Sequence, residues 1–159
     1  MIAMAPAAKI EDLTLSITEE IQVKAPMAAT FDALLEELGA GMIQGDNSPM
    51  PMKIEPWPGG RWCRDLGDGN GHLWGHVQAI KRPMLLEIYG PLMMSYAVTS
   101  NVQYRLAEEA GGTLIKFHHL ALGVIPADRK PGFAKGWHMI NERAQQRAEG
   151  LRGGKNAAR

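Results

Sequence analysis

Residues 131–150 read PGFAKGWHMINERAQQRAEG, and this stretch decides the fold. Its apolar residues recur at spacings of three and four, as on one face of an α-helix: Phe133, Trp137, Ile140, Ala144, Ala148 and then Leu151. Pro131 suits a first helical turn and Gly150 a helix end. The pattern predicts a helix over 131–150, about 30 Å long, which is enough to cross a small domain. Gly136 lies inside this pattern, where glycine weakens a helix, so we expect a close approach of another segment there.

The first 51 residues predict a loose arm, a strand, a helix and a connection. Apolar and polar residues alternate over 13–23, as in a strand with one buried face. Glu19 interrupts the apolar row, so it lies either at a strand bulge or at a wet opening. A helical stripe follows from Pro26 to Leu38. Residues 41–51 are rich in Gly, Pro, Asn and Met and predict a mobile connection that could act as a lid.

Residues 52–123 predict six short antiparallel strands, because short β-type runs are separated by turn residues. Short loops favour pairing of consecutive strands, and the simplest topology is a meander that curls around the C-terminal helix. In the last of these strands we expect the row Ile115, Phe117, His119 and Ala121 to face inward. With the first strand, the fold class is α+β, a curved antiparallel sheet of about seven strands around a long helix.

Composition limits the function. The 159 residues have the size of one globular domain, expected to span 1–159 with its core over about 13–150. Seventeen basic and seventeen acidic residues cancel, and they form no basic stripe, so neither nucleic acid nor an anionic membrane is an expected partner. The single Cys63 excludes an intramolecular disulfide, and the sequence shows neither a signal peptide nor a membrane span. We therefore expect a cytoplasmic protein.

Several short phrases resemble a known superfamily. They are the PGGRW of 58–62, the Asp68-Gly69 turn, the strand from Gly75 to Ile80, the Gly112-Thr113 turn leading to His119, and the pair Gly136-Trp137. The sequence resembles the START-like helix-grip (SRPBCC) superfamily, in the branch named after the activator of Hsp90 ATPase. Residues 41–51 lack the second helix that many members have there. The resemblance implies a cavity between sheet and helix that holds a lipid or another small apolar molecule.

Candidate ligand-binding residues follow from the expected cavity lining. Tryptophan and tyrosine place N–H and O–H groups on apolar bodies, and those groups need partners when buried. Alternatively these side chains fill an ordinary core. His119 is preferred to His118, which points to the opposite face, and Asn141 lies one turn from Trp137. The expected binding set is Trp62, Trp74, His76, Tyr96, Tyr104, Phe117, His119, Trp137 and Asn141.

Metal and cofactor binding are not expected. His72 and His76 lie four residues apart on a predicted strand, which separates them by about 13 Å, too far to share one ion. Motifs for serine hydrolases, zinc proteases, phosphate-binding loops and dinucleotide binding are absent from the sequence. No catalytic residue, metal site or cofactor is assigned.

Three functions remain open. The first is a non-enzymatic protein that binds a small apolar or aromatic molecule. The second is a polyketide cyclase or dehydratase in which His119 or His76 acts as general base and a tyrosine hydroxyl stabilises an enolate. The third, suggested only by the resemblance, is a co-chaperone of an Hsp90-type ATPase. The sequence leaves monomer and homodimer equally open.

Overall fold

The computed structural model describes residues 2–4 and 6–151. Its helices and strands follow the expected order: η1 (Ile10–Leu13), β1 (Thr14–Val23), α1 (Met27–Leu38), β2 (Lys53–Ile54), β3 (Arg61–Gly67), β4 (Asn70–Lys81), β5 (Leu85–Gly90), β6 (Val98–Glu109), β7 (Gly112–Gly123), η2 (Ala127–Arg129) and α2 (Lys130–Ala148). The predicted terminal helix is confirmed, one residue earlier at its start and two residues shorter at its end. The first helix also agrees closely with the expected 26–38.

The described strands form one antiparallel sheet in the order β1-β7-β6-β5-β4-β3-β2. Strands β2 to β7 are a meander, as short connections predict. The first strand lies at one edge of the sheet and pairs with the last strand, with Thr14 opposite Leu122 and Val23 opposite Thr113. The expected helix-grip architecture, seven strands and a long C-terminal helix, is confirmed.

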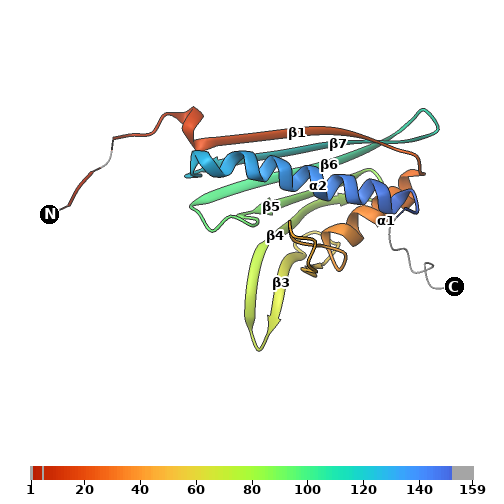
Figure 1. Ribbon diagram of the computed structural model, residues 1–159, viewed down its shortest axis with the longest axis horizontal. Helices are drawn as coiled ribbons and strands as arrows, with labels where there is room; N and C mark the ends of the chain where they lie inside the picture. Colours follow the sequence, from red (N-terminus) through yellow and green to blue (C-terminus); the bar gives the residue numbers. More distant parts are fainter. Residues whose placement is uncertain (1, 5, 152–159) are drawn as a thin grey trace.

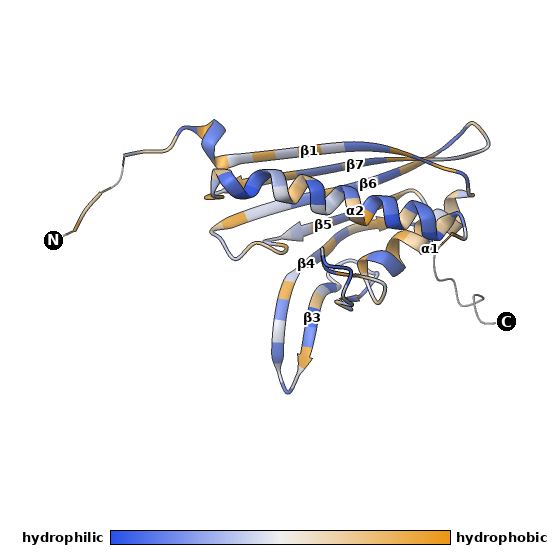
Figure 2. Cartoon of the chain, in the orientation of Figure 1, coloured by the Kyte–Doolittle hydropathy of each residue, from blue (hydrophilic) through white to orange (hydrophobic). Residues whose placement is uncertain are grey.

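Helix α2 lies along β1, β7 and β6, while the β3–β4 hairpin projects away from the helix (Figure 1). Much of α2 is hydrophilic, as its colouring in Figure 2 shows. Its stripe of Trp137, Ile140 and Ala144 is nevertheless buried. Because few residues of the helix are apolar, this stripe provides its main apolar contact with the core.

The inward row expected for β7 is confirmed. Ile115, Phe117, His119 and Ala121 each expose at most 2% of their surface. Ser100, Val102, Tyr104 and Leu106 form the matching inner row of β6. The two rows face α2, so the strand period correctly separated the inner from the outer side chains.

Two details of the predicted helix are wrong. Leu151 lies beyond the end of α2 and is 72% exposed, because the helix ends before this residue can join the stripe. A Cβ added at Gly136 would meet no atom within 4 Å, so the expected close approach does not occur. Asn141 and Arg143, by contrast, are buried although they are polar.

Residues 41–51 form a compact turn between α1 and β2. Ile43 and Pro49 form an isolated bridge, and the Met50 N–H donates to the Met42 carbonyl over 2.9 Å. Met42 and Met52 are buried in the core at its two ends. The segment is therefore held at both ends, and a role as a lid stays a prediction.

A buried ion cluster joins α1 to the second half of α2. The Glu37 carboxylate is 1% exposed and accepts hydrogen bonds from the guanidinium groups of Arg143 and Arg147. Arg143 also donates to the Gly41 carbonyl over 3.2 Å. Because each buried charge has an oppositely charged partner, the cluster holds the two helices together. No helix in the described part of the chain is long and apolar enough to span a bilayer.

Candidate functional site

His119 lies at the centre of the layer between the sheet and α2. Its side chain is fully buried, its Nδ1 accepts the indole N–H of Trp137 over 2.9 Å, and its Nε2 lies 2.9 Å from the Ser100 hydroxyl. Indole nitrogen can only donate, so Nδ1 carries no proton and Nε2–H donates to Ser100. Burial, and then the neighbouring His118, lower the pKa of His119 from 6.5 to about 4. The imidazole is therefore neutral at pH 7, with one fixed tautomer.

Aromatic rings surround this hydrogen bond. The Trp137 ring lies 4.8 Å from Phe117 and 6.4 Å from Trp62, centroid to centroid. Trp62 in turn contacts Trp74 edge-on at 5.1 Å and donates its indole N–H to the Leu38 carbonyl over 2.7 Å. These distances are those of favourable aromatic pairs. The layer is apolar, yet the indole N–H groups of Trp62 and Trp137 each have a directed acceptor.

A second set of hydrogen bonds runs from the core to the surface. The Tyr104 hydroxyl donates to Asn141 Oδ1 over 2.9 Å, and Asn141 Nδ2 donates to Glu19 over 2.7 Å. The other Glu19 oxygen lies 2.6 Å from Nδ1 of His138, which is exposed. Burial, and then the charge of Glu19, raise the pKa of Tyr104 well above its usual value of 10. The hydrogen bond to Glu19, and then its charge, raise the pKa of His138 above 6.5.

The structure thus brings together seven of the nine predicted site residues: Trp62, Trp74, Tyr104, Phe117, His119, Trp137 and Asn141. The other two lie outside this cluster, although Tyr96 lines a surface pocket at the start of α2. His76 stacks on the half-exposed Tyr89 of β5, with ring centroids 5.7 Å apart. Tyr96 lies in the β5–β6 connection and is 36% exposed.

Three further residues belong to the site. Ser100 lies in the inner row of β6, diagonal to His119, whose register partner is Val102. Strand alternation alone could have indicated that Ser100 faces inward. Glu19 is part of the hydrogen-bonded chain, at a half-open edge where 23% of its side chain is exposed. His138 follows Trp137 on α2, and only the fold brings it to Glu19, 119 positions away.

A surface pocket of about 410 Å³ lies at the start of α2, lined by Met93, Ser95, Tyr96, Arg129, Gly132 and Phe133. Met93 also packs against the main core. Phe133 packs against a smaller core cluster of Leu15, Met94, Ala121 and Ile125. The partly buried Ile17 contacts both clusters, so the apolar floor of this pocket continues into the layer around His119. We call this hollow the α2 pocket.

A larger hollow of about 560 Å³ follows the β3–β4 hairpin. None of the nine predicted residues lines it, and its charged groups pair with one another, as Lys53 does with Asp65 over 2.6 Å. Within the described residues, no three His, Cys, Asp or Glu side chains gather in an arrangement that could hold a metal ion. The α2 pocket and the layer behind it are therefore the better candidate for a binding site.

Comparison with solved structures supports this fold assignment. No family model matches the sequence, and no curated protein does. An uncharacterised protein from Rhizobium leguminosarum superposes with a TM-score of 0.66 at 17% identity, covering 86% of this chain and 95% of the other. The Aha1 dimer from Colwellia psychrerythraea gives 0.62 at 14% identity over 87% and 99% of the two chains.

A third structure, Ara h 8.0201, matches with a TM-score of 0.64 at 14% identity, covering 86% of this chain and 99% of the other. This chain has the START-like helix-grip fold. At these identities the START-like neighbours establish the fold and not the activity. In this START-like chain, the region between sheet and helix is filled by Trp137 and its aromatic neighbours.

Proposed function

We propose that the protein binds a small apolar or aromatic molecule between its sheet and α2. The observation that carries the proposal is that apolar packing continues from the α2 pocket to the aromatic layer. Met93 lines the pocket and packs against the main core, and Phe133 packs against a smaller cluster that shares Ile17 with that core. Methionine side chains are flexible and fill irregular space, so Met93 and Met94 can repack around a ligand. Binding sites for small molecules combine apolar walls with a few directed polar groups, and this layer has both.

The test is a titration with 8-anilinonaphthalene-1-sulfonate, an apolar aromatic probe whose fluorescence rises when water is excluded. We expect saturable binding at one site per chain. Gly132→Trp should abolish it, because Gly132 lines the pocket and a Cβ there meets open space. Gly136→Trp is the matched control: it lies on the same helix, its Cβ also meets open space, and it does not line the pocket.

Two outcomes would overturn the proposal. One is the absence of saturable binding by the folded wild-type protein. The other is equal binding by the Gly132→Trp and Gly136→Trp variants, since the probe would then sit elsewhere. Urea unfolding midpoints of both variants show whether each is still folded.

The structure offers no particular support for the cyclase or dehydratase alternative. Both ring nitrogens of His119 are engaged, by Trp137 and by Ser100. The Tyr104 hydroxyl is likewise engaged with Asn141. The co-chaperone alternative rests on likeness to Aha1. At 14% sequence identity, that likeness supports a shared fold and not a shared function. A cytoplasmic location remains a prediction from the sequence.

A further inference from the structure

The first half of α2 has few of the features that stabilise a helix. Glycine is the poorest helix former after proline, and Gly132 and Gly136 both lie within it. Neither glycine is required by packing, because a Cβ at either position would meet no atom within 4 Å. The helix start also has no side-chain cap and no acidic residue in its first turn. The segment from Lys130 to Gly136, which borders the α2 pocket, is thus the least stable part of the helix.

The second half of α2 is held firmly. Arg143 and Arg147 bind the buried Glu37 of α1. Gln145 donates to the Gln22 carbonyl over 2.6 Å, and Glu149, just past the helix, accepts the Lys24 N–H over 2.8 Å.

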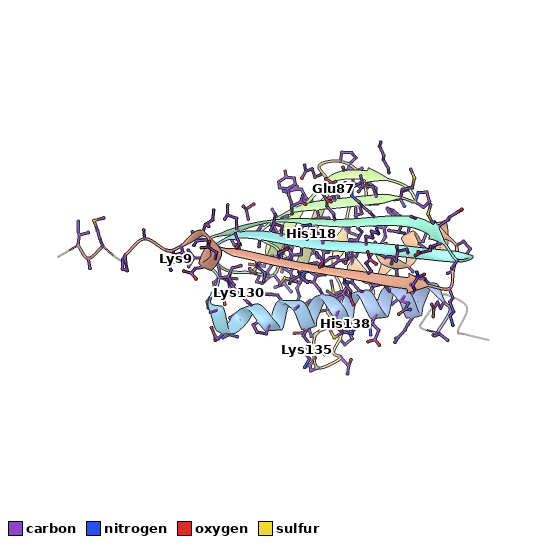
Figure 3. The ribbon with its side chains drawn as sticks, turned by 90° about the horizontal axis from the view of Figure 1, so that it is seen from above. Lys9, Glu87, His118, Lys130, Lys135 and His138 are labelled. Atoms are coloured by element: carbon purple, nitrogen blue, oxygen red, sulfur yellow. The ribbon has the colours of Figure 1, made fainter. Side chains whose placement is uncertain are left out.

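Side-chain polar contacts of the first half are fewer. The Lys130 amine donates to the carbonyls of Thr14 and Asp12 over 3.1 and 3.3 Å. Figure 3 shows Lys130 at the start of α2 beside β1, and His138 farther along the same helix. Opening of the helix would therefore begin at its first turns.

Trp137 lies at the boundary of these two halves. Phe133 precedes it by four residues, so both side chains lie on the same face of the helix, Phe133 at the α2 pocket and Trp137 on His119. When the first turns lift, the indole N–H leaves Nδ1 of His119. That nitrogen is then an acceptor without a partner in an apolar aromatic layer, an unfavourable state unless another donor takes its place.

We propose that His119 Nδ1 accepts a hydrogen bond from the ligand, and that the ligand is a flat aromatic molecule bearing an O–H or N–H group that replaces the Trp137 indole. This inference rests on the proposed function and names the chemical class of the ligand. The Ser100 hydroxyl accepts the hydrogen bond from Nε2–H of His119. Nδ1 is therefore already fixed as an acceptor before the ligand arrives.

The second buried polar group of the layer is a poorer candidate. Asn141 is 1% exposed and already bonds Tyr104 and Glu19. Both of these partners belong to the sheet, and Asn141 lies in the half of α2 that the ion cluster anchors. A ligand entering from the α2 pocket reaches His119 first.

The test compares 2-naphthol with 2-methylnaphthalene, which has the same shape without the donor. We expect the wild-type protein to bind 2-naphthol at least about tenfold more tightly, because a buried acceptor rejects an analogue that cannot donate. His119→Phe should reduce the difference to within about twofold, whereas His118→Phe, the same substitution on the outer face of β7, is the matched control and should retain it. Unfolding midpoints of both variants report whether they fold.

A second measurement follows the wild-type protein directly. In wild-type protein, the indole N–H resonance of Trp137, assigned with Trp137→Phe, should lose its hydrogen-bonded shift when 2-naphthol binds. Equal affinity for the two probes, or a preference kept in His119→Phe, would overturn this inference and leave the proposed function standing. Binding of neither probe would also overturn this inference, while the titration with 8-anilinonaphthalene-1-sulfonate tests the proposed function separately.

Discussion

Trp137 on α2 donates its indole N–H to Nδ1 of His119 on β7 over 2.9 Å, and both side chains are fully buried. This hydrogen bond joins the helix to the sheet at the midpoint of the aromatic layer. It fixes the tautomer of His119, since an indole cannot accept, and it places the largest side chain of α2 between the helix and the sheet.

Replacing Trp137 tests how tightly the layer is packed. Trp137→Ala should lower the free energy of unfolding by about 3–5 kcal/mol, because it leaves a large void in a buried layer. Trp137→Phe should cost less, about 1–3 kcal/mol, chiefly because His119 Nδ1 loses its donor. Urea unfolding measures both. A loss below about 1 kcal/mol for Trp137→Ala would contradict the packing described.

The buried ion cluster should matter more than any exposed ion pair. Removing one partner of a buried pair leaves an uncompensated charge, so Glu37→Gln should cost about 3–5 kcal/mol in urea unfolding. Asp65→Asn, which breaks the exposed Lys53–Asp65 pair, is the control and should leave the midpoint nearly unchanged. Similar effects of the two substitutions would show that the cluster does not anchor α2.

His119 should make stability fall with acid. Its pKa is about 4 in the folded protein against 6.5 unfolded, so folding favours the neutral form. The contribution is complete above pH 6.5 and is lost as the pH falls towards 4, by about 3 kcal/mol in total. His119→Gln should lack this component. We expect the stability difference between wild type and variant to shrink from pH 7.5 to pH 4; a constant difference would show that His119 does not titrate in this way.

Alanine should strengthen the first half of α2. Gly132→Ala and Gly136→Ala should each raise the free energy of unfolding by up to about 1 kcal/mol, because alanine is the better helix former and meets no atoms there. Hydrogen exchange of the amides over 130–137 should slow at the same time. Destabilisation by either substitution would mean that the glycine serves a contact that the folded chain does not reveal.

Periodicity was sufficient to predict α2 and the inward position of His119, because both follow from local side-chain alternation. The short connections predicted that consecutive strands pair. Hydrogen-bond and ion-pair partners that are distant in the sequence could not be predicted from local patterns. Glu37 and Arg143 lie 106 positions apart, and no local pattern pairs them. Glu19 was recognised as anomalous in its strand, but its partners Asn141 and His138 depend on where α2 crosses β1. Gly136 was given a packing role that it lacks, since low helix propensity alone does not reveal what lies nearby.

Ligand binding between the sheet and α2 is tested most directly by the indole N–H spectrum of the wild-type protein during titration with 8-anilinonaphthalene-1-sulfonate. Trp62, Trp74 and Trp137 belong to the buried layer, whereas Trp57 is 55% exposed and serves as an internal control. We expect the Trp137 resonance to shift and to saturate with one probe per chain, while the Trp57 resonance stays in place. Unchanged resonances of Trp62, Trp74 and Trp137 at a saturating probe concentration, or a shift of Trp57 alone, would contradict binding between the sheet and α2.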